Sequence, residues 1–177
     1  MFLLQMAGFP GSGKSTLAKE ISKYIDVVVI DRDVIKSSMI ESGVALNIVA
    51  NASYNVVFSL CKYYLSLNKN VIIDTPCYYN DSLDNGISIA HEYNAEYKFI
   101  ECRVEDFEVV NNRLRSRKRS ISQIEAAEKN RFLGAIDKSK RPTKTNYLVV
   151  DSSLKIESYI EKALNYIELR GDFYEIR

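Results

Sequence analysis

Apolar residues along the chain fall into two patterns: short continuous runs, and longer segments in which they recur every three or four positions. The short runs are rich in β-branched and aromatic residues, as is typical of strands. They cover residues 2–7, 27–30, 70–74, 96–102 and 146–151. Because each run is almost entirely apolar, we expect five strands that are covered on both faces, as in a mostly parallel sheet.

The segments between these runs have the spacing of amphipathic helices. The first follows the glycine-rich stretch after the first strand and runs to about Tyr24. The others contain Val56, Val57, Leu60, Tyr64 and Leu67, then Phe107, Val110 and Leu114, and finally Ile156, Ile160, Leu164 and Ile167. Ser152 or Ser153 is the expected N-cap of the last helix. Alternating strands and helices predict one three-layer α/β/α domain over residues 1–177.

Composition narrows the class of protein. Hydrophobic residues make up 46% and charged residues 27% of the chain, values that predict a packed, soluble domain. With 24 basic and 23 acidic residues, the net charge of +1 gives no overall bias toward nucleic acid or a membrane surface. The first strand lacks the basic flank of a signal peptide, and no run approaches the ~20 apolar residues of a membrane span.

Cysteine and histidine usage excludes several kinds of site. Cys61, Cys77 and Cys102 are odd in number and lack C-x-x-C spacing, which argues against a disulfide framework or a zinc site and favours a cytoplasmic location. His91 is the sole histidine, so it has no partner histidine for a metal site, and we assign it no role.

The stretch "GFPGSGKST" at 8–16 matches the phosphate-binding pattern G-x-x-x-x-G-K-[ST], and it lies where that pattern requires, between a strand and a helix. Glycines allow backbone angles that turn several N–H groups toward phosphate oxygens at the positive end of the helix. Lys14 is expected to reach the β- and γ-phosphates, and the Ser15 hydroxyl to bind Mg²⁺. The residues expected to hold the nucleoside triphosphate are Gly8, Pro10, Gly11, Ser12, Gly13, Lys14, Ser15 and Thr16.

Carboxylates follow two of the predicted strands. Asp31 and Asp33 lie two residues apart in "VVVIDRDVIK", so an extended chain directs both to one side. One can hold the water shell of Mg²⁺ while the other accepts a proton from a substrate hydroxyl; capping of the next helix is the alternative role. Asp74 follows the third strand and is expected to orient Mg²⁺ or substrate, unless it only ends a turn set by Pro76.

A basic run, "NNRLRSRKRS", begins at residue 111. Arg113 and Arg117, at positions i and i+4, would share one helical face and project together over a bound triphosphate. Guanidinium groups there would stabilise the charge on the transferred phosphoryl oxygens. A solvated helix face is the alternative.

These four motifs, "GFPGSGKST", "DRDVIK", "VIIDT" and "NNRLRSR", resemble those of small P-loop kinases, the zeta-toxin, chloramphenicol phosphotransferase and polynucleotide kinase group that is often labelled AAA-type ATP-binding. The resemblance covers Met1 to about Ile167. It implies a parallel sheet of order 2-3-1-4-5 and a mobile helical lid, around residues 113–131, that carries arginines onto ATP.

The resemblance also implies roles for single residues. Lys14 and Ser15 bind phosphate and Mg²⁺, Asp33 is the general base, and Arg117, with Arg113 as second choice, is the catalytic lid arginine. Asp31 and Asp74 join Ser15 as candidate metal ligands, and Asp33, Lys36 and Asp74 as candidate acceptor contacts. Polynucleotide kinases hold the acceptor's phosphate with an arginine where this chain has Lys36, which keeps the charge and loses the bidentate fork.

The acceptor stays open: a nucleic-acid 5′ end, a nucleoside or another small hydroxylated molecule fits. Tyr78 and Tyr79 are candidates for stacking on an aromatic acceptor, with packing as the alternative. A second hypothesis is a nucleotide-dependent ATPase switch with a protein partner, although the guanine-reading N-K-x-D pattern of GTPases is missing, since "NKNV" at 68–71 ends in valine. A third is a nucleic-acid module that uses the lid and "KSKRPTK" at 138–144, which the near-neutral charge disfavours.

Overall fold

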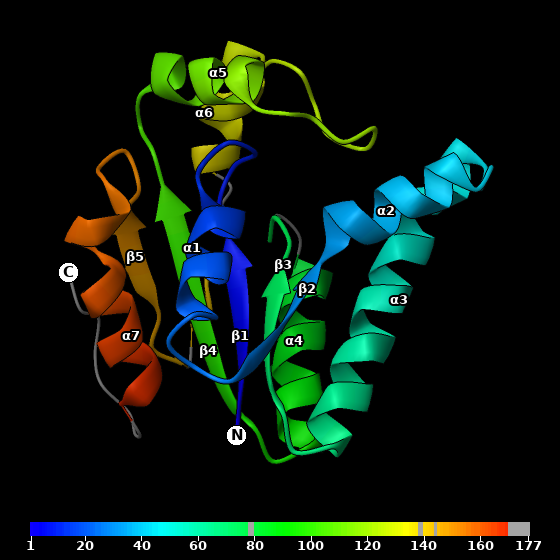
Figure 1. The fold of residues 1–177 in the computed structure, drawn as a ribbon, viewed down its shortest axis with the longest axis vertical. Helices are drawn as coiled ribbons and strands as arrows, with labels where there is room; N and C mark the ends of the chain where they lie inside the picture. Colours follow the sequence, from blue (N-terminus) through cyan, green and yellow to red (C-terminus); the bar gives the residue numbers. More distant parts are fainter. Residues whose placement is uncertain (78–79, 138–139, 144, 170–177) are drawn as a thin grey trace.

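The structure, a computed structural model, describes residues 1–77, 80–137, 140–143 and 145–169. Five strands form one sheet: β1 (Phe2–Ala7), β2 (Val27–Asp31), β3 (Asn70–Asp74), β4 (Glu96–Arg103) and β5 (Leu148–Asp151). All neighbouring pairs are parallel, and the strand order is β2-β3-β1-β4-β5 (Figure 1). The predicted sheet and its order are therefore confirmed.

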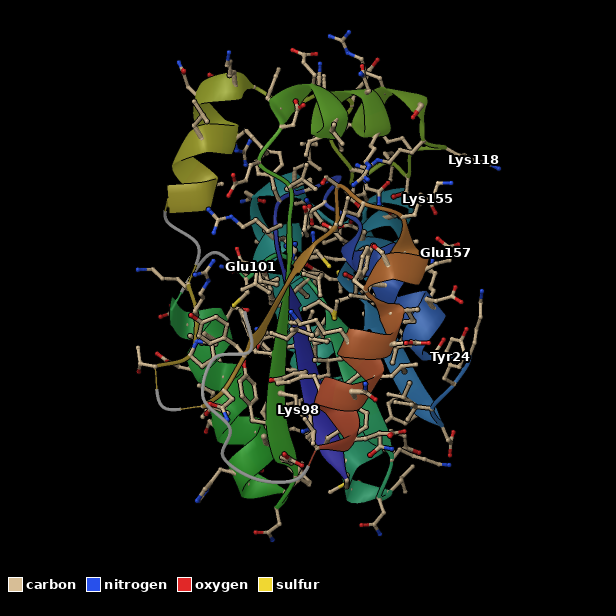
Figure 2. The ribbon with its side chains drawn as sticks, turned by 90° about the vertical axis from the view of Figure 1, so that its left-hand side faces the viewer. Tyr24, Lys98, Glu101, Lys118, Lys155 and Glu157 are labelled. Atoms are coloured by element: carbon tan, nitrogen blue, oxygen red, sulfur yellow. The ribbon has the colours of Figure 1, made fainter. Side chains whose placement is uncertain are left out.

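Helices cover both faces of this sheet (Figure 1). In chain order, the helices are α1 (Lys14–Ile21), α2 (Arg32–Glu41), α3 (Leu46–Ser66), α4 (Asn80–Glu92), α5 (Phe107–Ser116), α6 (Lys129–Asp137), the 3₁₀ turn η1 (Ile156–Ser158) and α7 (Ile160–Glu168). Helices α1 and α7 lie on one face and α3 and α4 on the other (Figure 1), and α5 and α6 stand beyond the carboxyl ends of the strands (Figure 1 and Figure 2). The carboxyl ends of the strands therefore face α5.

Successive side chains of β1 point to opposite faces of the sheet and so contribute to a hydrophobic core on each face. Leu4 and Met6 pack with Leu17 of α1 and Ile167 of α7, whereas Leu3 packs on the other side with residues of α3 and α4. Burial of such side chains stabilises the fold by about 1.5–3 kcal/mol each. A third cluster, which contains Phe9, Val104, Val110, Leu114 and Phe132, fixes α5 and α6 to the glycine loop.

Gln5 is a fully buried polar residue in the central strand β1. Its Nε2 donates to the Ser82 carbonyl at 3.1 Å and lies 3.3 Å from the Ser82 hydroxyl, while the Tyr97 hydroxyl donates to its Oε1 at 2.7 Å. Gly86 of α4 passes so close that a Cβ there would lie 2.2 Å from that oxygen. Gln5 therefore ties the first turns of α4 to the middle of the sheet.

The predicted cap of the last helix is wrong. Ser152 donates to the Arg103 carbonyl and Ser153 to Asp151, and the chain makes η1 before α7 begins at Ile160. Both serines thus close the turn after β5. Within the described part of the chain, no helix combines the length and apolar character needed to cross a membrane.

Candidate active site

The glycine loop joins β1 to α1 with three left-handed residues. Gly8, Gly11 and Gly13 have φ of 131°, 86° and 95°. A Cβ on Gly8 would stand 2.3 Å from the Cys102 carbonyl oxygen, so this position demands glycine for space as well as for conformation. The loop therefore directs its N–H groups toward the start of α1, where the helix dipole favours an anion.

Lys14 is a buried cation at the first position of α1. Its Nζ donates to the carbonyl oxygens of Gly8 and Phe9, at 2.9 and 3.1 Å. Burial lowers the pKa of Lys14, and the nearby Asp74 carboxylate partly opposes that effect. A charge held by two neutral carbonyls is poorly compensated, which favours an anionic ligand beside it.

Asp74 ends β3 next to Asp31, its register partner at the end of β2. It is buried, it hydrogen-bonds with Ser15, and its Oδ2 has no hydrogen-bond partner among the described residues. Burial raises the pKa of Asp74, and Lys14 opposes the rise. A buried carboxylate oxygen without a donor is a feature that a cation would satisfy.

Replacement of Asp74 by asparagine is expected to stabilise the nucleotide-free protein at pH 7. A raised pKa means that the ionised carboxylate is less stable in the fold than in the unfolded chain, so ionisation lowers stability as pH rises. We expect a gain of about 1 kcal/mol, or about 2–4 °C in Tm, for Asp74→Asn at pH 7. The gain should vanish below the ordinary carboxyl pKa of 3.8. Thermal unfolding at several pH values measures it, and a loss of stability at neutral pH would contradict this reading.

Asp31 and Asp33 take different positions at the start of α2. The Asp31 carboxylate accepts from the backbone N–H groups of Asp33, at 2.9 Å, and Val34, at 3.4 Å, and so caps the helix. Asp33, in the first turn, accepts from Gln123 Nε2 at its Oδ2, at 2.9 Å. Asp31 therefore has the helix-capping role that was the alternative for this motif. Both carboxylates line the cleft described below.

The segment 117–127, which we call the lid loop, reaches from the end of α5 to the start of α2. Its Ser122 hydroxyl donates to the Asp33 carbonyl at 3.1 Å and pairs with the Ser37 hydroxyl at 2.8 Å. These contacts place the lid loop directly against Asp33. Sequence reasoning missed Ser122 and Gln123, because no local pattern relates them to a residue about 90 positions away.

Arg113 and Arg117 do not share a helical face as predicted, although both line the cleft described below. Helix α5 ends at Ser116, and Arg117 has an extended backbone that turns its side chain inward, where Nη2 donates to the Ile124 carbonyl at 3.1 Å. Its buried Nε has no partner among the described residues, and burial lowers the pKa of Arg117 while Asp33 opposes the change. Arg113 instead points its Nη2 at the Ser153 carbonyl, at 3.4 Å.

A cleft of about 1620 Å³ is lined by most of these groups, among them Lys14, Asp33, Asp74 and Arg117. Its first arm, beside the glycine loop, is lined by Arg113, Ser152, Leu154, Ile156 and Tyr159. Its second arm lies between α2, α3 and α4, and its lining includes Lys36, Asn51, Tyr54, Asn55, Phe58, Asp81 and Asn85. Tyr78 and Tyr79 lie outside the described residues, as do residues 138, 139 and 144 of the basic segment 138–144.

The cleft suits a magnesium ion that shares its ligands with a nucleotide. Among the described residues, no three His, Cys, Asp or Glu side chains cluster tightly enough to form a metal site by themselves. Mg²⁺ commonly takes one or two protein ligands and completes its shell with water and phosphate oxygens. Ser15 and Asp74, with Asp31 at the adjacent strand end, fit that requirement.

A glycine loop that follows the central strand of a parallel 2-3-1-4-5 sheet defines the P-loop nucleotide-binding class of protein. A family model described as an AAA domain (AAA_33) matches residues 3–142, and the chain belongs to this family.

Solved structures share the same fold. A putative kinase from Chloroflexus aurantiacus aligns with a TM-score of 0.74 at 14% identity, over 93% of this chain and 97% of that one. A gluconokinase from Sinorhizobium meliloti aligns at 0.66 and 13% identity, over 94% and 91%. The APS kinase CysC of Mycobacterium tuberculosis, in complex with AMPPNP and APS, aligns at 0.62 and 13% identity, over 95% and 98%. The fold is thus that of small P-loop kinases.

Proposed function

We propose that this protein is a kinase that transfers the γ-phosphate of Mg-ATP to a hydroxyl group of a small molecule, a nucleoside or a nucleic-acid 5′ end. The observation that carries the proposal is the second arm of the cleft, which adds a wall of α2, α3 and α4 residues to the glycine loop and Asp33 in the same lining. An ATPase that transfers phosphate to water does not need a lined chamber beyond its phosphate site. The structural similarity to a gluconokinase and to an APS kinase supports the same class of reaction.

Each charged group has a role in such a transfer. The glycine loop and Lys14 hold the β- and γ-phosphates, and Ser15 and Asp74, with Asp31 nearby, would hold Mg²⁺, which neutralises phosphate charge when bound. Asp33 stands between the two arms, where a hydroxyl in the second arm can donate its proton to the carboxylate. Arg117, whose buried Nε has no partner within the described part of the chain, would stabilise the transferred phosphoryl group.

Arg113 and Arg117 are assigned to different ends of the bound nucleotide. Arg113 and the turn after β5 line the first arm, where a nucleobase would lie against Leu154 and Ile156. Arg117 shares its surroundings with Asp33 and so belongs to the phosphate end. We therefore assign the catalytic lid role to Arg117 and a nucleotide-binding role to Arg113.

Gln123 is proposed as a positioning residue for Asp33. Its amide donates to Oδ2 and leaves Oδ1 for the acceptor hydroxyl, while its own Oε1 accepts from the Ser120 N–H at 3.3 Å. We expect Gln123→Ala to lower kcat about 10-fold, because the carboxylate loses its orientation. Gln123→Glu, which replaces the donor with a like charge, should lower it further. ATP affinity should change less than twofold in both variants, and an equal loss of ATP binding would indicate a structural role instead.

The test of the proposed function is transfer of labelled γ-phosphate from Mg-ATP to pooled acceptors. The pools are RNA and DNA 5′-hydroxyl ends, nucleosides, sugars and sugar acids, and aminoglycoside or phenicol drugs. A kinase labels one pool. Label that leaves only as free phosphate, at a rate no pool increases, would replace the proposal with the ATPase switch.

A further inference from the structure

Arg32 is a buried cation in the wall of the cleft. Its side chain is nearly inaccessible, with 8% of the residue exposed, yet the residue lines the second arm. Nε donates to the Ser53 hydroxyl at 3.1 Å and Nη2 to the Ala50 carbonyl at 3.4 Å, and the guanidinium carbon lies 3.9 Å from the centre of the Tyr54 ring. All these contacts are with neutral groups of α3.

No acidic side chain of the described residues pairs with Arg32. Three arginines outside the cleft lining do have such partners, since Arg103 pairs with Glu105, Arg119 with Glu125, and Arg141 with the buried Glu101. Arg113 and Arg117, which line the cleft as Arg32 does, bind backbone carbonyls instead. The two neighbours of Arg32 in sequence are engaged elsewhere, since Asp31 caps α2 and Asp33 accepts from Gln123. A buried charge without a counter-ion is unfavourable unless a ligand supplies the opposite charge.

The position of Arg32 shows which ligand would supply that charge. The Tyr54 ring beneath it belongs to α3, and the Tyr54 hydroxyl donates to the Pro76 carbonyl at 3.4 Å, so the pair lies on the α3 and α4 side of the cleft. The groups that line the nucleotide arm, Arg113 and Ser152 to Tyr159, lie at the other end of the same cleft. The anion beside Arg32 therefore belongs to the acceptor rather than to ATP.

The rest of the second arm favours a hydroxylated molecule. Lys36 lies one turn after Arg32 on α2 and adds a second cation to the lining. Asn51 and Asn55 of α3 and Asn85 of α4 offer amide donors and acceptors to hydroxyl groups. Asp81 is the acidic member of the α4 wall, and it is exposed to water, which screens its charge.

We propose that the acceptor is a polyhydroxylated molecule that carries a carboxylate or phosphate group, and that Arg32, assisted by Lys36, binds this anionic group in the second arm of the cleft. The proposal rests on the proposed kinase function for the identity of the ligand as acceptor. It assigns the anion to a guanidinium whose stacked, hydrogen-bonded geometry is already fixed before the ligand arrives.

The first experiment needs no knowledge of the acceptor. The protein is saturated with Mg-ADP, so that the glycine loop is occupied, and is titrated with sodium sulfate at constant ionic strength, with the Nε–H signal of Arg32 followed by NMR. We expect a saturable shift with Kd of about 1–10 mM, a weak contact for a single anion. Arg32→Gln identifies the signal, and Arg115→Gln, at an exposed site on α5, is the matched control. A signal that does not move, or that drifts without saturation, overturns the proposal.

The second experiment compares acceptors that differ only in the anion: gluconate with glucitol, glycerate with glycerol, and a nucleoside 3′-phosphate with the nucleoside. The anionic member should be used with at least 10-fold higher kcat/KM, and Arg32→Gln should remove that preference while the neutral member changes less than threefold. Lys36→Gln, which leaves the α2–α3 contacts intact, should lower use of the anionic member about 3–10-fold. Equal use of both members by the wild-type protein overturns the proposal. Absence of transfer to every acceptor, together with saturable sulfate binding at Arg32, would instead remove the kinase function and keep the anion site.

Discussion

Replacement of Asp33 by asparagine is expected to lower phosphate transfer to the acceptor by about 10²–10⁴-fold, the range that general bases contribute. The amide keeps the shape of the side chain, and its oxygen can still accept from Gln123, so the fold of the lid loop should persist. The amide cannot accept the hydroxyl proton, and it lacks the negative charge that aligns the hydroxyl. We therefore expect kcat to fall while the Kd of Mg-ATP stays within twofold.

Asp26→Asn is the matched control for this substitution. Asp26 is strongly exposed, pairs with Lys69 and precedes β2 at the opposite end from Asp33, so its replacement should leave transfer unchanged. Steady-state transfer and equilibrium ATP binding, measured on both variants, separate chemistry from folding. Wild-type rates in Asp33→Asn would remove Asp33 as the base.

Arg117→Gln is expected to lower kcat by about 10³-fold, the smaller end of the range for an arginine that stabilises a transferred phosphoryl group. The Arg117 guanidinium has a buried Nε with no partner among the described residues and lies in the field of Asp33. In the proposed reaction, its charge would lie beside the transferred γ-phosphate. Removal of this side chain should therefore destabilise the transition state more than it weakens the binding of ATP.

Arg113→Gln provides the comparison from the same segment. Arg113 contacts the turn after β5 rather than the lid loop, so its replacement should raise the KM for ATP about 10-fold and change kcat less than threefold. Single-turnover transfer at saturating ATP tests both variants together. If Arg117→Gln mainly raises the KM for ATP and Arg113→Gln mainly lowers kcat, the roles of the two arginines are the reverse of those proposed.

The glycine loop could be predicted because all of its chemistry lies within nine consecutive residues, and its neighbours, a strand and a helix, carry their own patterns. The ends of β2 and β3 were predictable for the same reason, since an acidic residue directly follows each apolar run. The strand order came from resemblance, because periodicity reports which residues are strands and not which strands pair. Pairing is decided by contacts between distant segments.

The lid loop shows the limit of local patterns. Helical spacing put Arg113 and Arg117 on one face, but α5 ends between them, and a single extended residue sends the second side chain inward. The contact between Gln123 and Asp33 joins positions 90 residues apart, and neither residue has an unusual neighbour in sequence. The buried Arg32 was equally hidden, because sequence does not show that no acidic side chain in the described ranges pairs with it.

Gln5 connects the two arms of the cleft through strand β1. Strand β1 runs directly into the glycine loop, and the same strand, through Gln5, fixes the start of α4, which walls the second arm. In the proposed kinase, the distance between the triphosphate and the acceptor would therefore be set by the single strand β1. Cleft-facing residues of α3 and α4 can change, and a different acceptor can be accommodated, without any change in the distance over which the phosphate travels.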